Sequence, residues 1–184
     1  MSFSCIDLCS KALTKIGANS IVSFDEGTPE AEICGGLYYV LKYKLLSIFP
    51  WSFATATLKL NQVIEENLSG FVYTYALPNN FLRAIRINSN SSYKILGNYL
   101  YCNDEEVYLT YIVNVGEEYF SPVFISAFIY LLAAELSISL LNDNSKYSLF
   151  YRLFNSEIKE AKSIDSMQET PKTISDFSLI NIRK

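Results

Sequence analysis

The sequence predicts an α+β protein that is mainly α: a helical bundle with an antiparallel β-rich region inserted between the second and third long helices. Apolar residues recur at helical spacing near both ends of the chain, whereas those after residue 54 alternate with a period of two. The change falls at Phe49 to Ala54, where Pro50 ends a helix and Trp51 and Phe53 need covering. We therefore expect N-terminal helices in 1–54, a β-rich insertion in 55–117, C-terminal helices of the same bundle in 118–168, and an extended tail in 169–184.

The first helix is expected from Phe3 to Ile16. Ser2 or Ser4 can cap its start, and Gly17 supplies the left-handed residue that ends it. Because the apolar side chains between these limits recur at helical spacing, this helix is expected to present one buried face.

The second helix has a clearer start signal, with Thr28 as the N-cap and Pro29 at the first helical position. It is expected to run to Phe49. Lys42 and Lys44 are expected to extend toward solvent. The buried face is expected to consist of Leu37, Val40, Leu41, Leu45 and Ile48.

Two adjacent glycines, Gly35 and Gly36, lie inside this second helix. Each costs about 1 kcal/mol relative to alanine in a helix interior. Either another backbone packs closely against them or the helix bends there.

The middle of the chain is expected to form an antiparallel sheet of short strands. The dipeptide Gly97-Asn98 between two apolar runs predicts a hairpin. Arg83, Arg86 and Lys94 could form a small basic stripe, although ordinary solvent-facing alternation explains them better. Strands are expected at 55–60, 71–76, 82–87, 93–96, 99–102 and 107–115, with polar loops at 61–70 and 88–92.

A third helix is expected to begin at Ser121, which can cap it, and Pro122. Residues 123–141 are nearly all apolar, so a membrane anchor through this segment is one alternative. Glu135 inside the segment, and the lack of a basic cluster at either end, favour a helix buried on most sides.

A fourth helix is expected from Ser145 to about Met167, antiparallel to the third because the loop between them is short. Its predicted buried face is Tyr147, Phe150, Tyr151, Phe154, Ile158 and Ala161. Helical period is lost from Glu169 onward. The tail carries apolar residues among polar ones, which predicts a partner-binding segment made of Phe177, Leu179, Ile180 and Ile182.

Composition restricts the function classes. Half of the residues are hydrophobic and 15% are aromatic, including 14 tyrosines, a residue type enriched where proteins meet proteins. The net charge is -4 and the pI about 4.9, so the electrostatic footprint of a nucleic-acid binder is missing. The chain contains no histidine, which removes the commonest general base and metal ligand.

The four cysteines, Cys5, Cys9, Cys34 and Cys102, show no metal-ligand spacing and no disulfide framework. We expect small buried thiols, no metal and no cofactor, in a protein that folds in a reducing, cytosolic compartment. The N-terminus has no basic region followed by an apolar run, so no signal peptide is expected.

Paired carboxylates are candidate catalytic groups, because a glycosidase needs two of them across a cleft. Glu65-Glu66, Asp104 to Glu106 and Glu117-Glu118 all lie in predicted turns, where charges are usually solvated. Glu135 differs because its neighbours are apolar, and a virion-associated peptidoglycan hydrolase using it with another carboxylate is a second alternative. No catalytic residue is assigned.

The order of several motifs resembles the head-to-tail adaptor proteins of short-tailed bacteriophages, the tail tubular protein A group. The resemblance covers about Leu8 to Ser163. Its departures are Gly35-Gly36 and the sequence after Asp165. The motifs are Lys11 to Ala18, a Pro-Glu-Ala start at Pro29, Phe49 to Ala54, Tyr73 to Pro78 followed by Phe81-Leu82-Arg83, Tyr108 to Val113, and Phe124 to Leu140.

This resemblance implies a structural virion protein, not an enzyme, at the head-tail junction and assembled in the host cytoplasm. Copies would form a homo-oligomeric ring, a dodecamer by the resemblance, that binds the portal protein, extends the DNA channel and docks the tail nozzle protein. DNA would pass through without specific binding. The residues of these motifs expected to mark the core are Pro50, Trp51, Phe53, Pro78, Leu132 and Glu135.

Overall fold

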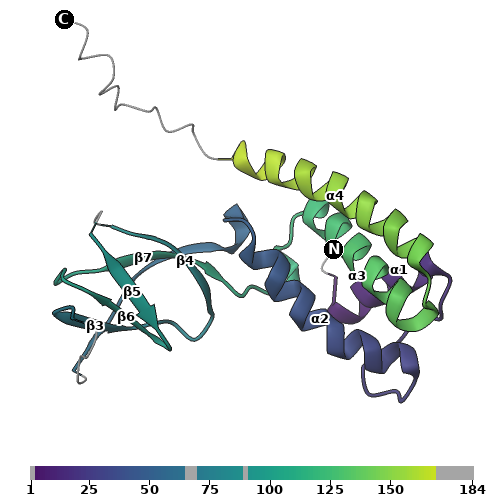
Figure 1. The fold of residues 1–184 in the computed structure, drawn as a ribbon, viewed down its shortest axis with the longest axis horizontal. Coiled ribbons are helices and arrows are strands. Elements are labelled where there is room, and N and C mark those ends of the chain that lie inside the picture. Colours follow the sequence, from purple (N-terminus) through teal and green to yellow (C-terminus); the bar gives the residue numbers. More distant parts are fainter. Residues whose placement is uncertain (1–2, 65–69, 89–90, 169–184) are drawn as a thin grey trace, which may run out of the picture.

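A computed structural model describes residues 3–64, 70–88 and 91–168. The described residues contain four helices and two antiparallel sheets, so the expected α+β mix is confirmed. The helices gather at one end of an elongated molecule and the strands at the other (Figure 1). The helices are α1 (Cys5–Ile16), α2 (Pro29–Ser47), α3 (Pro122–Leu141) and α4 (Asn144–Ser166).

The helix starts follow from capping side chains. Ser4 caps α1 in a reciprocal box with Asp7, and the Ala31 amide donates to the Thr28 hydroxyl at the start of α2. The Phe124 amide donates to Ser121 at the start of α3. α4 begins one residue earlier than expected, because the Asp143 side chain accepts from the first free amides. α2 ends at Ser47 rather than Phe49.

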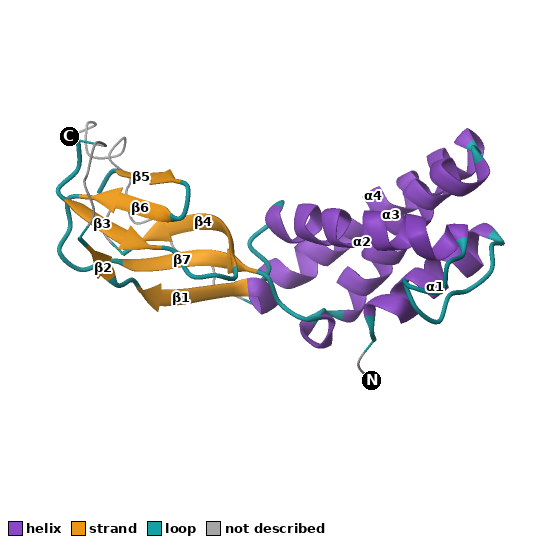
Figure 2. Ribbon diagram, turned by 90° about the horizontal axis from the view of Figure 1, so that it is seen from below, coloured by secondary structure: helices purple, strands orange, loops and turns teal. Residues whose placement is uncertain are grey.

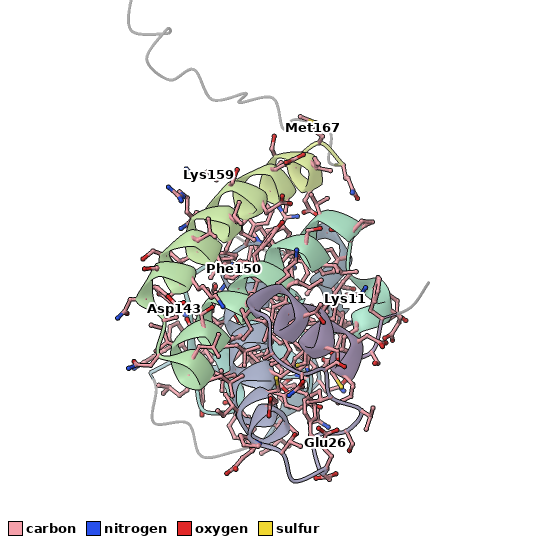
Figure 3. All side chains as sticks on the ribbon, turned by 90° about the vertical axis from the view of Figure 1, so that its right-hand side faces the viewer. Lys11, Glu26, Asp143, Phe150, Lys159 and Met167 are labelled. Carbon is pink, nitrogen blue, oxygen red and sulfur yellow. The ribbon has the colours of Figure 1, made fainter. Side chains whose placement is uncertain are left out.

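The central helix is α3, which contacts each of the other three helices. Ten of its residues are buried, and Leu132 is fully so. Figure 1 shows α2 and α4 on opposite sides of α3. Figure 3 views the molecule from its helical end, with Lys159 extending outward from α4. Within α4, the predicted face is buried at Phe150, Phe154, Ile158 and Ala161, whereas Tyr151 is 39% exposed.

The strands form two sheets instead of the single sheet that the sequence predicts (Figure 2). Each sheet has one apolar face, and the two faces pack together in a second core. Leu109 and Tyr111 of one sheet and Tyr75 and Leu100 of the other are buried there. The order is β1-β7-β4 in one sheet and β2-β3-β6-β5 in the other. The bounds are β1 (Thr55–Lys59), β2 (Gln62–Val63), β3 (Tyr73–Ala76), β4 (Phe81–Ile87), β5 (Tyr93–Leu96), β6 (Tyr99–Cys102) and β7 (Tyr108–Val113).

Local features of the strands confirm some expectations and correct others. Gly97 has a φ of +56° in the predicted hairpin between β5 and β6. β2 lies in a segment that was expected to be a loop. β4 carries two register shifts, so that Arg83 and Arg86 oppose Ile112 and Thr110 on one face of their sheet. A single basic stripe that includes Lys94, the less favoured of the two interpretations, is wrong, because Lys94 belongs to the other sheet.

The chain passes between helices and strands twice, each time through a short 3-10 helix. It leaves through η1 (Ser52–Ala54) and returns through η2 (Glu117–Tyr119). The first core, centred on α3, includes Ile112 of β7 and is covered at that end by Leu82 and Ile85 of β4. The two parts therefore share apolar packing where they meet.

Candidate interaction surfaces

Trp51 lies fully buried at the corner between α2 and η1, as expected of a core mark. Its indole N–H donates to the Leu45 carbonyl at 3.0 Å, so the buried donor is satisfied. Its ring meets Phe53 at 5.8 Å and Phe124 of α3 at 5.0 Å between centroids. Pro50 precedes it and is exposed, so its expected place in the core is wrong, because the proline only ends the helix and the aromatic rings fill the core. This corner is a packing element with no reactive group.

A second polar contact holds the same corner. Asp165, near the end of α4, accepts hydrogen bonds from the Ser52 amide at 2.8 Å and the Ser52 hydroxyl at 2.7 Å. Asp165 is buried, with 7% of its surface exposed. Because the two residues are 113 positions apart, no local pattern in the sequence indicates the contact.

An ion pair ties α2 to η2, where the chain returns from the strands. Lys42 donates to the Glu117 carboxylate at 2.8 Å, and the Tyr38 hydroxyl donates to the same oxygen at 2.9 Å. Lys42 was expected to extend toward solvent, and this is wrong, because only 6% of its side chain is exposed. Burial acts to raise the pKa of Glu117, but the hydrogen bonds from Lys42 and Tyr38 outweigh it and hold that pKa below its usual range.

The carboxylates considered for catalysis do not form a catalytic pair in the described residues. Glu117 is held by Lys42, and Glu106 makes an exposed ion pair with Lys59 at 2.7 Å. Glu135 lies half-buried on α3, and no hydrogen bond or ion pair joins its carboxylate to another described residue. Burial, followed by the charge of Glu135, raises the pKa of Tyr147. Glu65 and Glu66 lie outside the described residues.

Thiols and metal-binding groups give no further site. Cys9, Cys34 and Cys102 are buried and Cys5 is half-buried, all four free. A hydrogen bond with Cys34, together with burial, raises the pKa of the Cys9 thiol, which suits a packing role. In residues 3–64, 70–88 and 91–168, no group of three or more cysteines and carboxylates could hold a metal ion.

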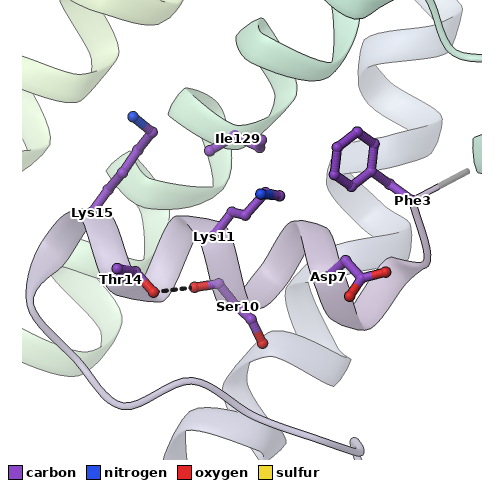
Figure 4. Close-up of a pocket in the computed structure, with 7 residues that line it drawn as sticks. All are labelled: Phe3, Asp7, Ser10, Lys11, Thr14, Lys15 and Ile129. Carbon is purple, nitrogen blue, oxygen red and sulfur yellow. Dashed lines mark hydrogen bonds between the residues drawn. The ribbon is translucent and has the colours of Figure 1, made fainter. Parts of the chain in front are cut away.

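Two hollows lie apart from these contacts. One, about 760 Å³, runs along α1 and is lined by Lys11, Lys15, Phe3 and Ile129 among others, with Lys11 extending toward Phe3 (Figure 4). The other is formed by Pro78 and Asn79 after β3 together with the Gly97 turn. Pro78 accepts from the Phe81 amide and closes the turn into β4. Neither hollow gathers catalytic groups.

Exposed apolar side chains on α2 are the first candidate interaction surface. Tyr39, Val40 and Tyr43 are 46%, 63% and 39% exposed, and they surround Gly36 on the side of α2 that faces away from α3. We call Gly36, Tyr39, Val40 and Tyr43 the α2 surface. Val40 and Ile48 were both expected on the buried face, and this is wrong, because Val40 is exposed and Ile48 is 46% exposed. Tyr38 and Lys42 occupy that face instead.

The glycines of α2 behave differently from each other. The helix is continuous from Pro29 to Ser47, so the expected bend is absent. A Cβ on Gly35 would lie 3.6 Å from the Phe24 side chain, whereas a Cβ on Gly36 would meet no atom of residues 3–64, 70–88 and 91–168 within 4 Å. Gly36 therefore leaves a flat, open place in the middle of the α2 surface.

A second apolar surface lies on α4. Leu149 and Leu153 are 44% and 36% exposed and, four residues apart, lie on one side of the helix. We call Leu149 and Leu153 the α4 ridge.

The tyrosine surplus and Gly36 were the available signals in the sequence for such surfaces. The predicted partner-binding residues Phe177, Leu179, Ile180 and Ile182 lie outside the described residues.

Helix α3 is long and apolar enough to cross a membrane by length and composition, and 56% of its most apolar window is buried inside the protein. A buried core helix passes the same test. Comparison with models of protein families finds no match to this chain, and comparison with curated proteins finds no significant match.

Proposed function

We propose that this chain is a structural virion protein, a head-tail adaptor that forms a ring beneath the portal protein of a short-tailed bacteriophage. In this proposal the four helices form one bundle and residues 55–117 are an insertion into it. The ring extends the DNA channel and offers a docking surface to the tail nozzle protein. No catalysis or cofactor is required.

The observation that carries the proposal is the place of the resembling motifs in the fold. The stretch from Pro50 to Phe53 forms the corner between helices and strands, Tyr73 to Pro78 forms β3 and its exit, and α3 is the helix that all others contact. The motifs thus occupy the points that define this architecture, and this supports the proposal.

Two further properties agree with this role. The α2 surface and the α4 ridge leave apolar side chains exposed on the helices, as expected of a protein that works by binding other proteins. The net charge of -4 suits a channel through which DNA slides, because phosphates that meet no cations gain no counterion release.

The test is electron microscopy of purified portal complexes with and without this protein. We expect an added ring of density beneath the portal vertex, and the complex should then bind the tail nozzle protein. Portal complexes that look the same with and without the protein, at saturating concentration, would contradict the proposal.

A further inference from the structure

We propose that the α2 surface of one copy receives the α4 ridge of a second copy, in a head-to-tail contact with the two helices parallel. The inference deepens the proposed ring, on which it rests for its biological setting, by naming the faces through which copies meet. A contact between two different faces repeats from copy to copy and closes into a ring when the rotation allows.

The first argument is Gly36. A glycine in the interior of a helix weakens it, and among the described residues no atom outside the helix itself comes close enough to Gly36 to require the missing side chain. A second helix that packs there would require it, because the absence of a Cβ lets two helices approach closely. The exposed side chains of Tyr39, Val40 and Tyr43 surround Gly36 and would contact the second helix.

The second argument is the shape of the α4 ridge. Two leucines four residues apart on one helix form a ridge of the kind that packs into the groove of another helix. Within one chain the ridge cannot reach the α2 surface, because α2 and α4 lie on opposite sides of α3 (Figure 1). A neighbouring copy can bring them together.

The third argument is the order of charges along the two helices. Glu32 lies one turn before Gly36, and Lys44 lies one turn after Val40. The two are separated by about 18 Å along α2 at the usual rise per residue. Both are exposed, so each is available to a partner.

On α4 the order of charges is reversed. Lys146 precedes Leu149 by three residues, and Glu157 follows Leu153 by four, a separation of about 17 Å. Lys146 already donates to the Ile16 carbonyl at 2.8 Å, which leaves two of its N–H groups. If the two helices are parallel, Glu32 meets Lys146 and Lys44 meets Glu157, so opposite charges pair at both ends of the contact. Antiparallel helices would pair like charges, so the charges favour the parallel direction.

The anchoring of the α2 surface adds to its fitness for binding. The Tyr39 ring lies edge-on to Tyr38 at 5.4 Å between centroids, and Tyr38 is itself fixed by its hydrogen bond to Glu117. Tyrosines already held in place lose little rotamer freedom on association. The α2 surface is thus preorganised.

The experiment measures association by sedimentation velocity in four full-length chains: wild type, Tyr43→Asp on the α2 surface, Leu153→Asp on the α4 ridge, and Leu96→Asp as control. Leu96 is 45% exposed and lies in β5, far from both surfaces. Circular dichroism melting should show all four folded. We expect association to be at least tenfold weaker in each of the two interface variants than in the wild type. The control should associate as strongly as the wild type.

A mixture of the two interface variants decides the geometry. Each variant keeps one intact face, so the mixture should form dimers of one Tyr43→Asp and one Leu153→Asp chain, and nothing larger. Gly36→Leu should weaken association at least tenfold while raising the melting temperature, which no purely structural role of Gly36 would produce. A mixture that stays monomeric, or self-association of Leu153→Asp at wild-type strength, would overturn the inference.

The remaining outcomes separate this inference from the proposed function. A wild-type chain that stays monomeric up to about 1 mM overturns the inference. Head-to-tail dimers from the mixture, together with no ring on portal complexes, support the contact and contradict the adaptor function. A ring on portal complexes that both interface variants still form supports the adaptor function and overturns the contact.

Discussion

Replacing Lys42 with methionine should destabilise the protein by about 3 kcal/mol, near the low end of the roughly 3–5 kcal/mol that losing one partner of a buried ion pair costs. The reason is that the Glu117 carboxylate is left without its cation at a site where 19% of its side chain is exposed. The low end applies because this exposure and the remaining Tyr38 hydrogen bond compensate part of the loss.

The assay is urea unfolding followed by tryptophan fluorescence. Trp51 is the only tryptophan in the chain and is fully buried, so its emission reports on the corner that α2 leads into. The double variant Lys42→Met/Glu117→Gln removes both charges and leaves an acceptor for Tyr38. It should recover at least half of the loss, because no unpaired charge remains buried.

The matched control is Lys59→Met, because the Lys59–Glu106 pair has similar length but both side chains are more than half exposed. Its stability should equal that of the wild type. The reasoning fails if Lys42→Met loses no more stability than Lys59→Met, or if the double variant is no more stable than Lys42→Met alone.

The same pair predicts a pH dependence. The pKa of Glu117 is held below its usual range in the folded protein, so the unfolded chain binds the proton more readily at acid pH. The stabilisation is therefore fully present above the pKa of Glu117 in the unfolded chain, about 4.3. It is lost as the pH falls below that value through the folded pKa, and the loss should be smaller in Lys42→Met.

Three further predictions concern other contacts. Asp165→Ala should cost about 1–3 kcal/mol, because the Ser52 amide loses its acceptor and the Ser52 hydroxyl keeps only Gln168, and amide exchange at Ser52 should accelerate. Gly36→Ala should stabilise the isolated chain by about 1 kcal/mol in thermal unfolding, since helix propensity rises where space is open. Burial raises the pKa of Tyr75 to about 12, so stability should fall as pH rises from about 10 to that value. Tyr75→Phe should make this fall smaller in alkaline titrations followed by circular dichroism, and the fall that remains comes from other buried tyrosines such as Tyr38, whose pKa burial also raises.

Features governed by local chemistry were predictable from the sequence. The start of α2 at Thr28 and Pro29, the start of α3 at Ser121 and the turn at Gly97 all agree with the structure. Each depends on a cap or turn residue that acts over a few positions. The burial of Trp51 followed from its size and its place after a helix.

Features that depend on distant residues were not predictable. Lys42 is buried because Glu117, 75 positions away, meets it, and no helical pattern contains that information. The division into two sheets depends on which strands pair, and β3 pairs with β6 rather than with its neighbour β4. In the sequence, Val40 fits the helical pattern of apolar residues as well as the buried residues of α2 do. Only the position of α3 shows that Val40 is exposed.

The candidate surfaces illustrate the same limit. The surplus of tyrosine indicated that some rings would lie at contacts between proteins, but not that Tyr39 and Tyr43 would be those rings. The sequence shows that Gly36 is unfavourable in a helix interior. Only the structure shows that the space beside Gly36 is open and that exposed apolar side chains surround it.

The two crossings between helices and strands have a mechanical consequence. A part joined by one linker can swivel about it, whereas the strand-bearing part is held by the Ser52–Asp165 and Glu117–Lys42 contacts, and Ile112 of β7 packs into the core of the helices. Twisting or tilting it requires both fastenings to yield together. A load applied at the far tip is shared between two anchors on different helices, so the strand-bearing part should transmit torque to the helices without turning at the joint.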